Sequence, residues 1–245
     1  MGPRWLFDRV DSTQRLAVEH IRSGGEPGAR FVARSQDAGR GRLDHAWASP
    51  RGGLYLSLVV AEPSEGATLL PLGVGVMAGA GIEGRFGVPT VLKWPNDLLV
   101  VRPPELPRKL AGTLTDRVEG PNGAALAVGV GVNVSSQRSE FPEAVRDRVA
   151  ILSDYVRTPP SLDQVESVVV DAIEQVGVML RTEAGRHRLL GACRSALYGV
   201  GRRALVDGRP AGVIRALGDD GALWLQDGHH RVPVRAGSVA VVEGT

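Results

Sequence analysis

The feature of this chain that most constrains its fold is an uncharged stretch at residues 68–82, which contains Pro71 and four glycines. A membrane-spanning helix needs roughly 20 apolar residues, so this stretch predicts a tightly packed buried helix instead. Apolar runs follow at residues 88–94 and 98–101, and each is apolar enough to form a central strand. A buried helix beside central strands indicates a fold that mixes helices with a sheet.

Upstream of this helix, the sequence predicts one short helix and two strands. The tract DST at residues 11–13 precedes an apolar periodicity, so a capped helix should start near Ser12. Residues 30–34 and 54–60 are typical of strands. Between the strands, residues 39–53 are too rich in Gly, Arg and Pro for regular structure, and long loops inside a compact domain are usually functional.

Downstream, the pattern predicts a hairpin and a second helix. Apolar runs at residues 114–118 and 124–134 flank the turn sequence EGPNG, which is typical of a β-hairpin. Ser161 and Gln164 have the spacing of a capping box, and the apolar positions that follow predict a long amphipathic helix.

The last fifty residues differ from the rest of the chain in their pattern of apolar residues and glycines. Five short apolar runs, interrupted by glycines, are typical of a small β-barrel. A chain of 245 residues has room for a large domain and a small module. We therefore expect a domain at residues 1–195 and a small barrel at residues 196–245.

Composition excludes several classes of protein. Cys193 is the only cysteine, so an intrachain disulfide and a cysteine-built zinc site are impossible, and a reducing cytoplasm fits best. The first residues include Asp8, Arg9 and Asp11 and lack the apolar core of a signal peptide. The net charge of +2, from 29 basic and 27 acidic residues, does not demand a general polyanion-binding role.

Lysine is almost absent from this chain. Of the 29 basic residues only Lys93 and Lys109 are lysines, and each lies in a distinctive tract. An ammonium is a compact point charge whereas a guanidinium is a planar fork. In a chain that otherwise uses arginine, the two retained lysines therefore indicate a site that needs an ammonium group. The simpler alternative is that both lysines were retained by chance on a solvated surface.

The tract GRGR at residues 39–42 alternates glycine and arginine. Glycine lets the backbone approach a ligand closely, and two guanidiniums suit carboxylates and phosphates. The tract is neither a dinucleotide-binding fingerprint nor a P-loop. By itself it is equally compatible with a flexible loop or a nucleic-acid contact.

The order of the tracts makes the pattern specific. The other tracts are, in chain order, DST (11–13), WASP (47–50), LYLS (54–57), KWPND (93–97), KLAG (109–112) and GVGVN (129–133). This set resembles the biotin-protein ligases, also called holocarboxylase synthetases, over residues 5–134. The resemblance implies an α+β fold of the class II aminoacyl-tRNA-synthetase type, a mixed sheet flanked by helices, with a small C-terminal SH3-like β-barrel. Strand-like residues 4–10 lead straight into DST, so we expect a catalytic-only member without a DNA-binding domain.

The resemblance also implies an activity and its partners. Such an enzyme uses ATP and Mg²⁺ to convert biotin to biotinyl-5'-AMP, and then transfers biotin to a lysine of a carboxylase's biotin carboxyl carrier domain. It implies no DNA or membrane partner, and a monomer or weak homodimer in the cytoplasm.

Carried over position by position, the resemblance assigns the site residues. Biotin contacts are expected from Ser12, Thr13, Gln14, Gln36, Gly39, Arg40, Gly41, Arg42, Lys109, Gly112 and Gly129. ATP contacts are expected from Arg40, Arg42, Trp47, Lys93, Asn96, Asp97, Lys109 and Asn133. Lys109, Arg40 and Arg42 would stabilise the charge that develops when a carboxylate meets the α-phosphate. Asp97 is the candidate general base for transfer and a candidate Mg²⁺ ligand, with Asp37 and Asp44 as alternative bases.

Two other functions stay open from the sequence. A lipoate or octanoate ligase of the same fold would activate or transfer a different acid, although GRGR argues against it. A basic nucleic-acid-binding protein would use the same arginines, but an aromatic content of 4% leaves few stacking platforms. The chain also departs from the family after Arg42, where LDHA at residues 43–46 replaces a second Arg-Gly pair and makes that side of the loop less basic.

Overall fold

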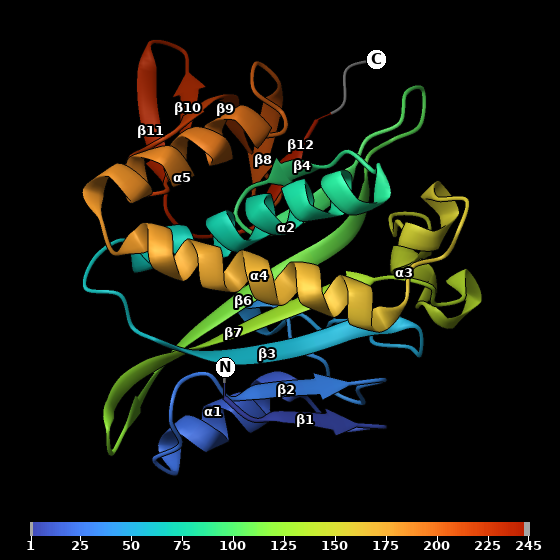
Figure 1. The fold of residues 1–245 in the computed structure, drawn as a ribbon. Coiled ribbons are helices and arrows are strands. Elements are labelled where there is room, and N and C mark those ends of the chain that lie inside the picture. Colours follow the sequence, from blue (N-terminus) through green and yellow to red (C-terminus); the bar gives the residue numbers. More distant parts are fainter. Residues whose placement is uncertain (1, 243–245) are drawn as a thin grey trace.

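The computed structural model describes residues 2–242, with the backbone but not the side chain of residue 44. Its larger sheet has seven strands in the order β1-β2-β3-β7-β6-β5-β4 (Figure 1). The strands are β1 (Arg4–Phe7), β2 (Arg30–Ala33), β3 (Gly53–Ala61), β4 (Val91–Lys93), β5 (Asp97–Val100), β6 (Arg108–Gly120) and β7 (Gly123–Asn133). The β1–β2 pair is parallel and the other neighbours are antiparallel, which confirms the predicted mixed sheet.

Helices cover both faces of this sheet (Figure 1). The helices are α1 (Thr13–Arg22), α2 (Leu70–Phe86), α3 (Glu143–Arg146), α4 (Leu162–Leu180) and α5 (Glu183–Ala196), with 3-10 turns at Arg42–Asp44, Ala67–Leu69, Arg138–Glu140 and Leu152–Tyr155. Val59 and Ala127 pack in the apolar cluster of α1, whereas their neighbours Leu58 and Val128 pack in the cluster of α2 and α4. Because side chains alternate along a strand, α1 lies alone on the opposite face from α2 and α4.

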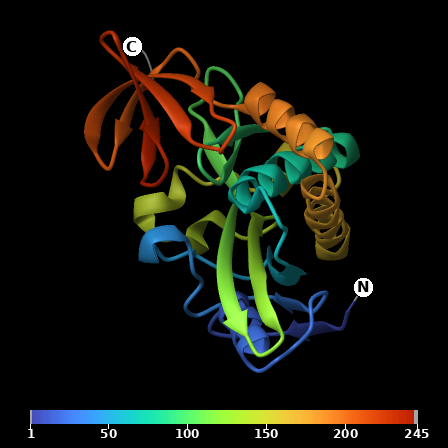
Figure 2. The same cartoon turned by 90° about the vertical axis from the view of Figure 1, so that its left-hand side faces the viewer.

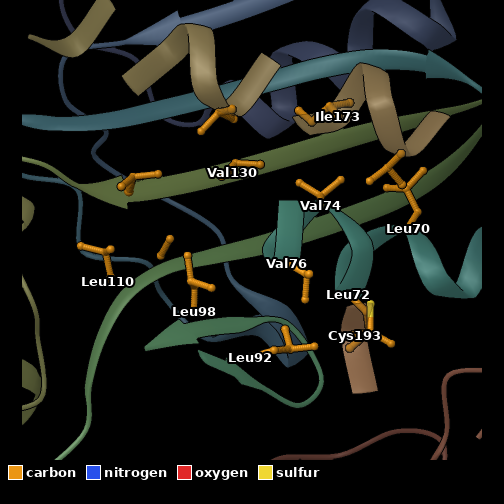
Figure 3. Packing of buried hydrophobic residues seen from close by; sticks show 14 of the residues in the cluster. Leu70, Leu72, Val74, Val76, Leu92, Leu98, Leu110, Val130, Ile173 and Cys193 are labelled. Carbon is orange, nitrogen blue, oxygen red and sulfur yellow. The ribbon is translucent and has the colours of Figure 1, made fainter. Parts of the chain in front are cut away.

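Helix α2 is the buried helix that the uncharged stretch predicts. Its window Ala67–Phe86 is long and apolar enough to cross a membrane by composition, with a hydropathy of 1.3, but 56% of the window is buried inside the fold. Its glycines permit close packing: a Cβ at Gly73 or Gly81 would lie 2.8 or 2.7 Å from a side-chain atom of a neighbouring helix. Figure 3 shows α2 side chains such as Val74 and Val76 in the core. Helix α2 is thus a core helix of this fold.

The starts of helices α4 and α1 can be compared with the capping residues that the sequence predicts. Ser161 and Gln164 form the predicted capping box of α4. Helix α1 begins at Thr13 with Ser12 at the N-cap, as predicted, but the Ser12 side chain accepts no hydrogen bond from the helix. Its hydroxyl is therefore available for another purpose.

The C-terminal strands form a five-stranded antiparallel sheet in the order β11-β10-β9-β8-β12. They are β8 (Arg203–Val206), β9 (Arg209–Leu217), β10 (Leu223–Asp227), β11 (His230–Val234) and β12 (Val239–Val241). The number of strands is as predicted, but the expected closed barrel is wrong. Within the described chain, β11 pairs with β10 and the three-residue β12 pairs with β8, so the sheet stays open between its two edges.

The core is continuous across residue 195. One cluster of buried apolar side chains contains Leu56 and Val130 of the large sheet together with Ile214, Leu223 and Val239 of the small sheet. The buried Trp94 indole N–H also donates to a backbone oxygen of the small sheet's β9–β10 turn at 2.9 Å. The C-terminal sheet is therefore packed onto the part of the molecule that carries the tracts between residues 11 and 133.

Candidate active site

A cavity of about 240 Å³ opens on the α1 side of the large sheet. The loop that carries GRGR and the C-terminal sheet close over it, and Figure 2 shows the 3-10 turn at Arg42–Asp44 beneath that sheet. The predicted site residues that line the cavity are Ser12, Thr13, Gln14, Gln36, Arg40, Gly41, Arg42, Trp47, Lys93, Asn96, Asp97, Lys109, Gly112 and Gly129. Gly39 and Asn133 do not line it. The structure thus brings together residues as far apart in the sequence as Ser12 and Gly129.

One end of the cavity, which we call the neutral end, consists of Ser12, Thr13, Gln14, Gln36 and Ser57. The backbone N–H and the hydroxyl of Thr13 both donate to Gln36 Oε1, at 2.8 and 3.2 Å. Ser57 donates to Gln14 Oε1 at 3.0 Å and lies 3.0 Å from the Thr13 hydroxyl. Thr13, Gln14 and Ser57 are buried and Gln36 is partly buried, and because they are hydrogen-bonded to one another their orientations are fixed without a ligand.

Ser12 is the exception in the neutral end. Ser12 is 3% exposed, and its hydroxyl has no hydrogen-bond partner among the described residues. A buried hydroxyl without a partner costs free energy, so such groups are usually satisfied by something that binds there.

The floor of the cavity is built from glycines that face each other across β6 and β7. Gly112 lies opposite Gly131, and a Cβ at either position would come within 2.9 Å of the Trp47 ring. A Cβ at Gly129 would lie 2.5 Å from Gln14 Oε1. The family resemblance assigns Gly112 and Gly129 to close approach of biotin. In the structure, Trp47 lies against Gly112 and Gln14 lies against Gly129.

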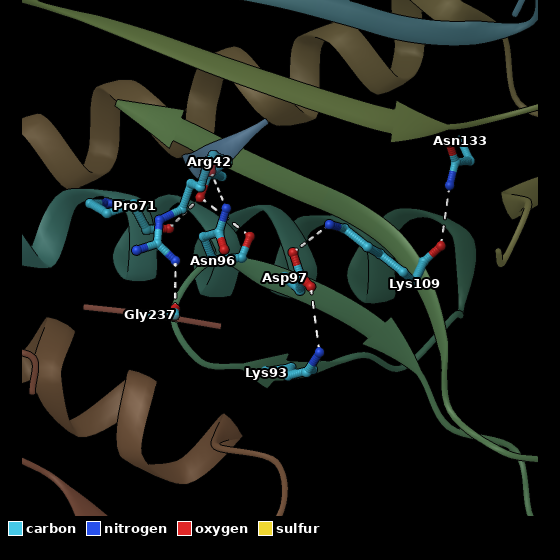
Figure 4. Close-up of polar contacts among 9 residues, drawn as sticks. Arg42, Pro71, Lys93, Asn96, Asp97, Lys109, Asn133 and Gly237 are labelled. Atoms are coloured by element: carbon cyan, nitrogen blue, oxygen red, sulfur yellow. Dashed lines mark hydrogen bonds and ion pairs between the residues drawn. The ribbon is translucent and has the colours of Figure 1, made fainter. Parts of the chain in front are cut away.

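The other end, which we call the charged end, consists of Arg42, Lys93, Asp97 and Lys109 (Figure 4). Lys109 Nζ lies 2.6 Å from Asp97 Oδ1, and Lys93 Nζ lies 3.9 Å from Asp97 Oδ2. One carboxylate thus faces two ammonium groups. Burial lowers the pKa of Lys93, the attraction of Asp97 opposes this, and the charge of Lys109 adds to it.

Trp47 and Arg42 connect the GRGR tract and the loop that follows it to the charged end. Lys109 Nζ lies over the Trp47 ring, 4.7 Å from its centroid, which is a cation–π distance. Arg42 Nη1 donates to the backbone oxygen of Gly237 at 3.5 Å. Burial lowers the pKa of Arg42 and Asp97 opposes this, although a guanidinium keeps its proton at any ordinary pH.

The two asparagines of the tracts have structural partners. Asn96 Nδ2 donates to the Thr113 backbone oxygen at 2.6 Å, which holds the turn between β4 and β5 onto β6. Asn133 Nδ2 donates to the backbone oxygen of Lys109 at 3.2 Å. Asn133 therefore supports the strand position of Lys109 rather than forming part of the cavity wall (Figure 4).

The residues do not build a metal site on their own. Within residues 2–242, no group of three or more His, Cys, Asp or Glu side chains could hold an ion. Asp97, the expected Mg²⁺ ligand, is already in contact with two ammonium groups. Mg²⁺ binds mainly to phosphates and water in nucleotide sites, so an ion here would arrive with ATP.

Of the two alternative bases, Asp37 does not line the cavity. Asp37 accepts a hydrogen bond from Arg9 Nε at 2.7 Å on an exposed surface. The side chain of Asp44 lies outside the described residues. Asp97 is the one carboxylate among the described residues that line the cavity.

Several lining residues were missed in the sequence. Those with side chains or backbone in the cavity wall include Leu43, His45, Tyr55, Ser57, Thr113, Leu114, Gly131, Gly237, Ser238 and Val239. Gly131 could have been found, because strand alternation places it on the same face as Gly129. No signal in residues 237–239 indicates that the C-terminal sheet would reach the site.

Known proteins resemble this chain in sequence and in fold. The sequence model of the Biotin/lipoate A/B protein ligase family matches residues 6–133. The chain is 34% identical over 158 residues to the bifunctional ligase/repressor BirA of Bacillus spizizenii, a match that covers 62% of this chain and 47% of that protein. The chain therefore spans about half the length of that relative.

Two further relatives match along almost the whole chain. The biotin--[acetyl-CoA-carboxylase] ligase of Mycobacterium tuberculosis is 30% identical over 243 residues, which covers 94% of this chain and 86% of that protein. The solved structure of the Aquifex aeolicus biotin protein ligase in complex with biotin and ATP has 25% identity and a TM-score of 0.81, and covers 100% of both chains. The family model, the sequence relatives and the fold agree, and this chain belongs to the biotin/lipoate A/B protein ligase family.

Proposed function

We propose that this protein uses ATP to convert biotin to biotinyl-5'-AMP and then transfers biotin to a lysine of a carboxylase's carrier domain. The observation that carries the proposal is a single cavity with a neutral, hydrogen-bonding end and a cationic end. Biotin has the same division, with a neutral ureido ring at one end and a carboxylate at the other. The family and the biotin ligases among the relatives support this choice.

The neutral end suits the ureido ring. That ring offers two N–H donors and one carbonyl acceptor, which the hydroxyls and amides of Ser12, Thr13 and Gln36 can satisfy. The Ser12 hydroxyl, which has no partner among the described residues, would gain a hydrogen bond from the ring. Leu56, Leu114 and other apolar lining residues would then contact the aliphatic tail.

The charged end suits the adenylation step. A carboxylate oxygen of biotin attacks the α-phosphorus of ATP, and pyrophosphate leaves. Two anions must approach each other, so cations on the reacting oxygens lower the barrier. Lys109, Arg42 and Arg40 would supply them, and Asp97 would keep the Lys109 ammonium in place.

In the transfer step a carrier lysine loses a proton, its nitrogen attacks the acyl carbon of the adenylate, and AMP leaves. Asp97 is our candidate to accept that proton, because it is the described carboxylate at the cavity. Its close contact with Lys109 must loosen for this, which the arrival of the adenylate phosphate would allow, since that phosphate competes for the same ammonium.

The experiment combines the protein with ATP, Mg²⁺ and either biotin or lipoate, and follows pyrophosphate release with and without a biotin carrier domain. We expect release with biotin, and labelled carrier when the domain is present. Release with lipoate alone would show that the protein is a lipoate ligase of the same family. Tight binding to nucleic acid without any acid-dependent release would favour the non-enzymatic alternative.

A further inference from the structure

Ser49 is a buried polar residue close to the cavity, and the proposed function gives it no role. It is 8% exposed and does not line the cavity. Its hydroxyl donates to the backbone oxygen of Trp47 at 3.0 Å and accepts from Gln36 Nε2 at 2.8 Å. A hydroxyl has only one proton, and this one is directed at Trp47. Toward Gln36, Ser49 can therefore act only as an acceptor.

The side-chain amide of Gln36 is held from both sides by groups of opposite kind. Its Oε1 accepts from the backbone N–H of Thr13 at 2.8 Å, and a backbone N–H can only donate. Its Nε2 donates to Ser49, which can only accept. A flipped amide would place donor against donor at Thr13 and acceptor against acceptor at Ser49. Gln36 thus keeps one orientation, with a second N–H of Nε2 that makes no hydrogen bond among the described residues and is available to the cavity that Gln36 lines.

Gly39 leaves the room that the Ser49 hydroxyl needs. A Cβ at Gly39 would lie 2.4 Å from the backbone oxygen of Trp47 and 2.5 Å from Ser49 Oγ. The Trp47 N–H also donates to the backbone oxygen of Gly39 at 2.8 Å, so the two segments lie directly against each other. Gly39 does not line the cavity. The absence of a side chain here therefore serves the contact between Ser49 and Trp47.

We propose that Ser49 is a positioning residue for biotin binding, which holds the Gln36 amide so that an N–H is directed at the ureido carbonyl. This rests on the proposed function, because the ureido ring is the neutral group expected at this end of the cavity. Ser49 does not touch the ligand and acts only through Gln36. A side chain that is ordered before the ligand arrives binds it more tightly than a free one, since binding no longer has to restrict its rotation.

The test is a double-mutant cycle between Ser49 and Gln36. Ser49→Ala, Gln36→Ala and the double variant are compared with the wild type by their Kd for biotin, from calorimetric titration without ATP. A second cycle uses Ser49→Cys, because a thiol has a similar size but accepts and donates only weakly. Ser35→Ala is the matched control: Ser35 precedes Gln36 in the chain, but its hydroxyl donates to the backbone oxygen of Asp8 at 3.2 Å, and it does not line the cavity.

We expect Ser49→Ala to raise the Kd for biotin about fivefold, the effect of one lost hydrogen bond, and Ser49→Cys to raise it less. In the Gln36→Ala background, neither change should have a further effect. The Kd should change more than the rate of pyrophosphate release at saturating biotin, and Ser35→Ala should leave the Kd unchanged.

Three results would overturn the proposal: an unchanged Kd in Ser49→Ala, an equal effect of Ser49→Ala with and without Gln36, or an equal rise of Kd in Ser35→Ala. The last two would make Ser49 a structural residue of its loop. If Ser49→Ala does not fold, as urea unfolding would show, the cycle with Ser49→Cys decides. A wild-type protein that releases no pyrophosphate with biotin would instead defeat the proposed function.

Discussion

The two ends of the cavity are built in opposite ways. At the neutral end, Thr13 and Gln36 are fixed by hydrogen bonds of 2.8 and 3.2 Å between uncharged, part-buried groups. At the charged end, Asp97 is shared between two ammonium groups, and Arg42 reaches the C-terminal sheet through one long hydrogen bond. The neutral end is a preformed socket, whereas the charged end has more positive than negative charge and is completed by an anionic ligand.

This difference separates recognition from chemistry. A rigid neutral site selects its ligand by shape and hydrogen bonding, and mutations there should change affinity for one substrate. An electrostatic site stabilises developing charge, and mutations there should change the rate of the chemical step. The four predictions below test that division, in order of decreasing effect.

The largest effect is expected from Lys109→Ala. This change removes the ammonium that lies 2.6 Å from Asp97 and leaves a carboxylate where two anions must meet. The rate of adenylate formation should fall about 1000-fold, as for other lost groups that stabilise transition-state charge. Pyrophosphate release at saturating biotin measures it, and the KM for biotin should hardly change. A normal rate with a raised biotin KM would reverse our assignment of the two ends.

Arg42→Gly should have the next largest effect. It removes the contact with Gly237 and frees the turn that covers the charged end. The adenylate should then leave the enzyme roughly ten to 100 times faster, since a charge-assisted contact is lost and the loop is loosened. Release of labelled biotinyl-5'-AMP after rapid dilution gives the rate. Arg9→Gly, a change at an exposed arginine outside the cavity, is the control and should retain the adenylate.

Ser12→Ala tests the neutral end alone. The Ser12 hydroxyl has no partner in the structure, so its loss should leave the free energy of unfolding unchanged or slightly improved. The KM for biotin should nevertheless rise about tenfold, because one hydrogen bond to the ligand is lost. Urea unfolding and biotin titration provide the two measurements. A destabilised protein with normal biotin affinity would make Ser12 a structural residue.

The smallest effect concerns pH. Burial lowers the pKa of Lys93, so this ammonium loses its proton at a lower pH than an ordinary lysine. A neutral amine no longer attracts phosphate, and the KM for ATP should rise about threefold between about pH 7 and about pH 9.5. Lys93→Arg keeps its charge over this range and should flatten the curve. If the slope persists in Lys93→Arg, another group is responsible.

The sequence was most informative where a motif forms a continuous piece of backbone. Ser12 is the N-cap of α1, Lys93 ends β4 and Lys109 lies near the start of β6, so the placement of their tracts at the ends of regular elements follows from local pattern. The short strands after residue 203 were also recognisable, because each is bounded by glycine. Whether those strands close into a barrel depends on pairing between distant edges, which local pattern does not determine.

Long-range contacts account for what was missed. Gly237 reaches the cavity only because the C-terminal sheet packs on the common core, and nothing near it in sequence records that packing. Gly129 and Gly131 of the GVGVN tract line the cavity, and strand alternation places Asn133 on the same face, but Asn133 does not line the cavity and its amide donates to the Lys109 backbone. The roles of Asn96 and Asn133 toward ATP stay predictions.

The scarcity of lysine has a consequence for the chemistry of the molecule itself. An acyl adenylate that escapes its enzyme acylates whatever amine it meets first, and the nearest protein is the one that made it. Here the only two side-chain amines lie in the cavity, 28% and 35% exposed, and both face Asp97. Arginine provides the rest of the positive surface, and a guanidinium stays protonated and unreactive. Under the proposed function, the protein's own adenylate would therefore meet no side-chain amine of this chain outside the cavity.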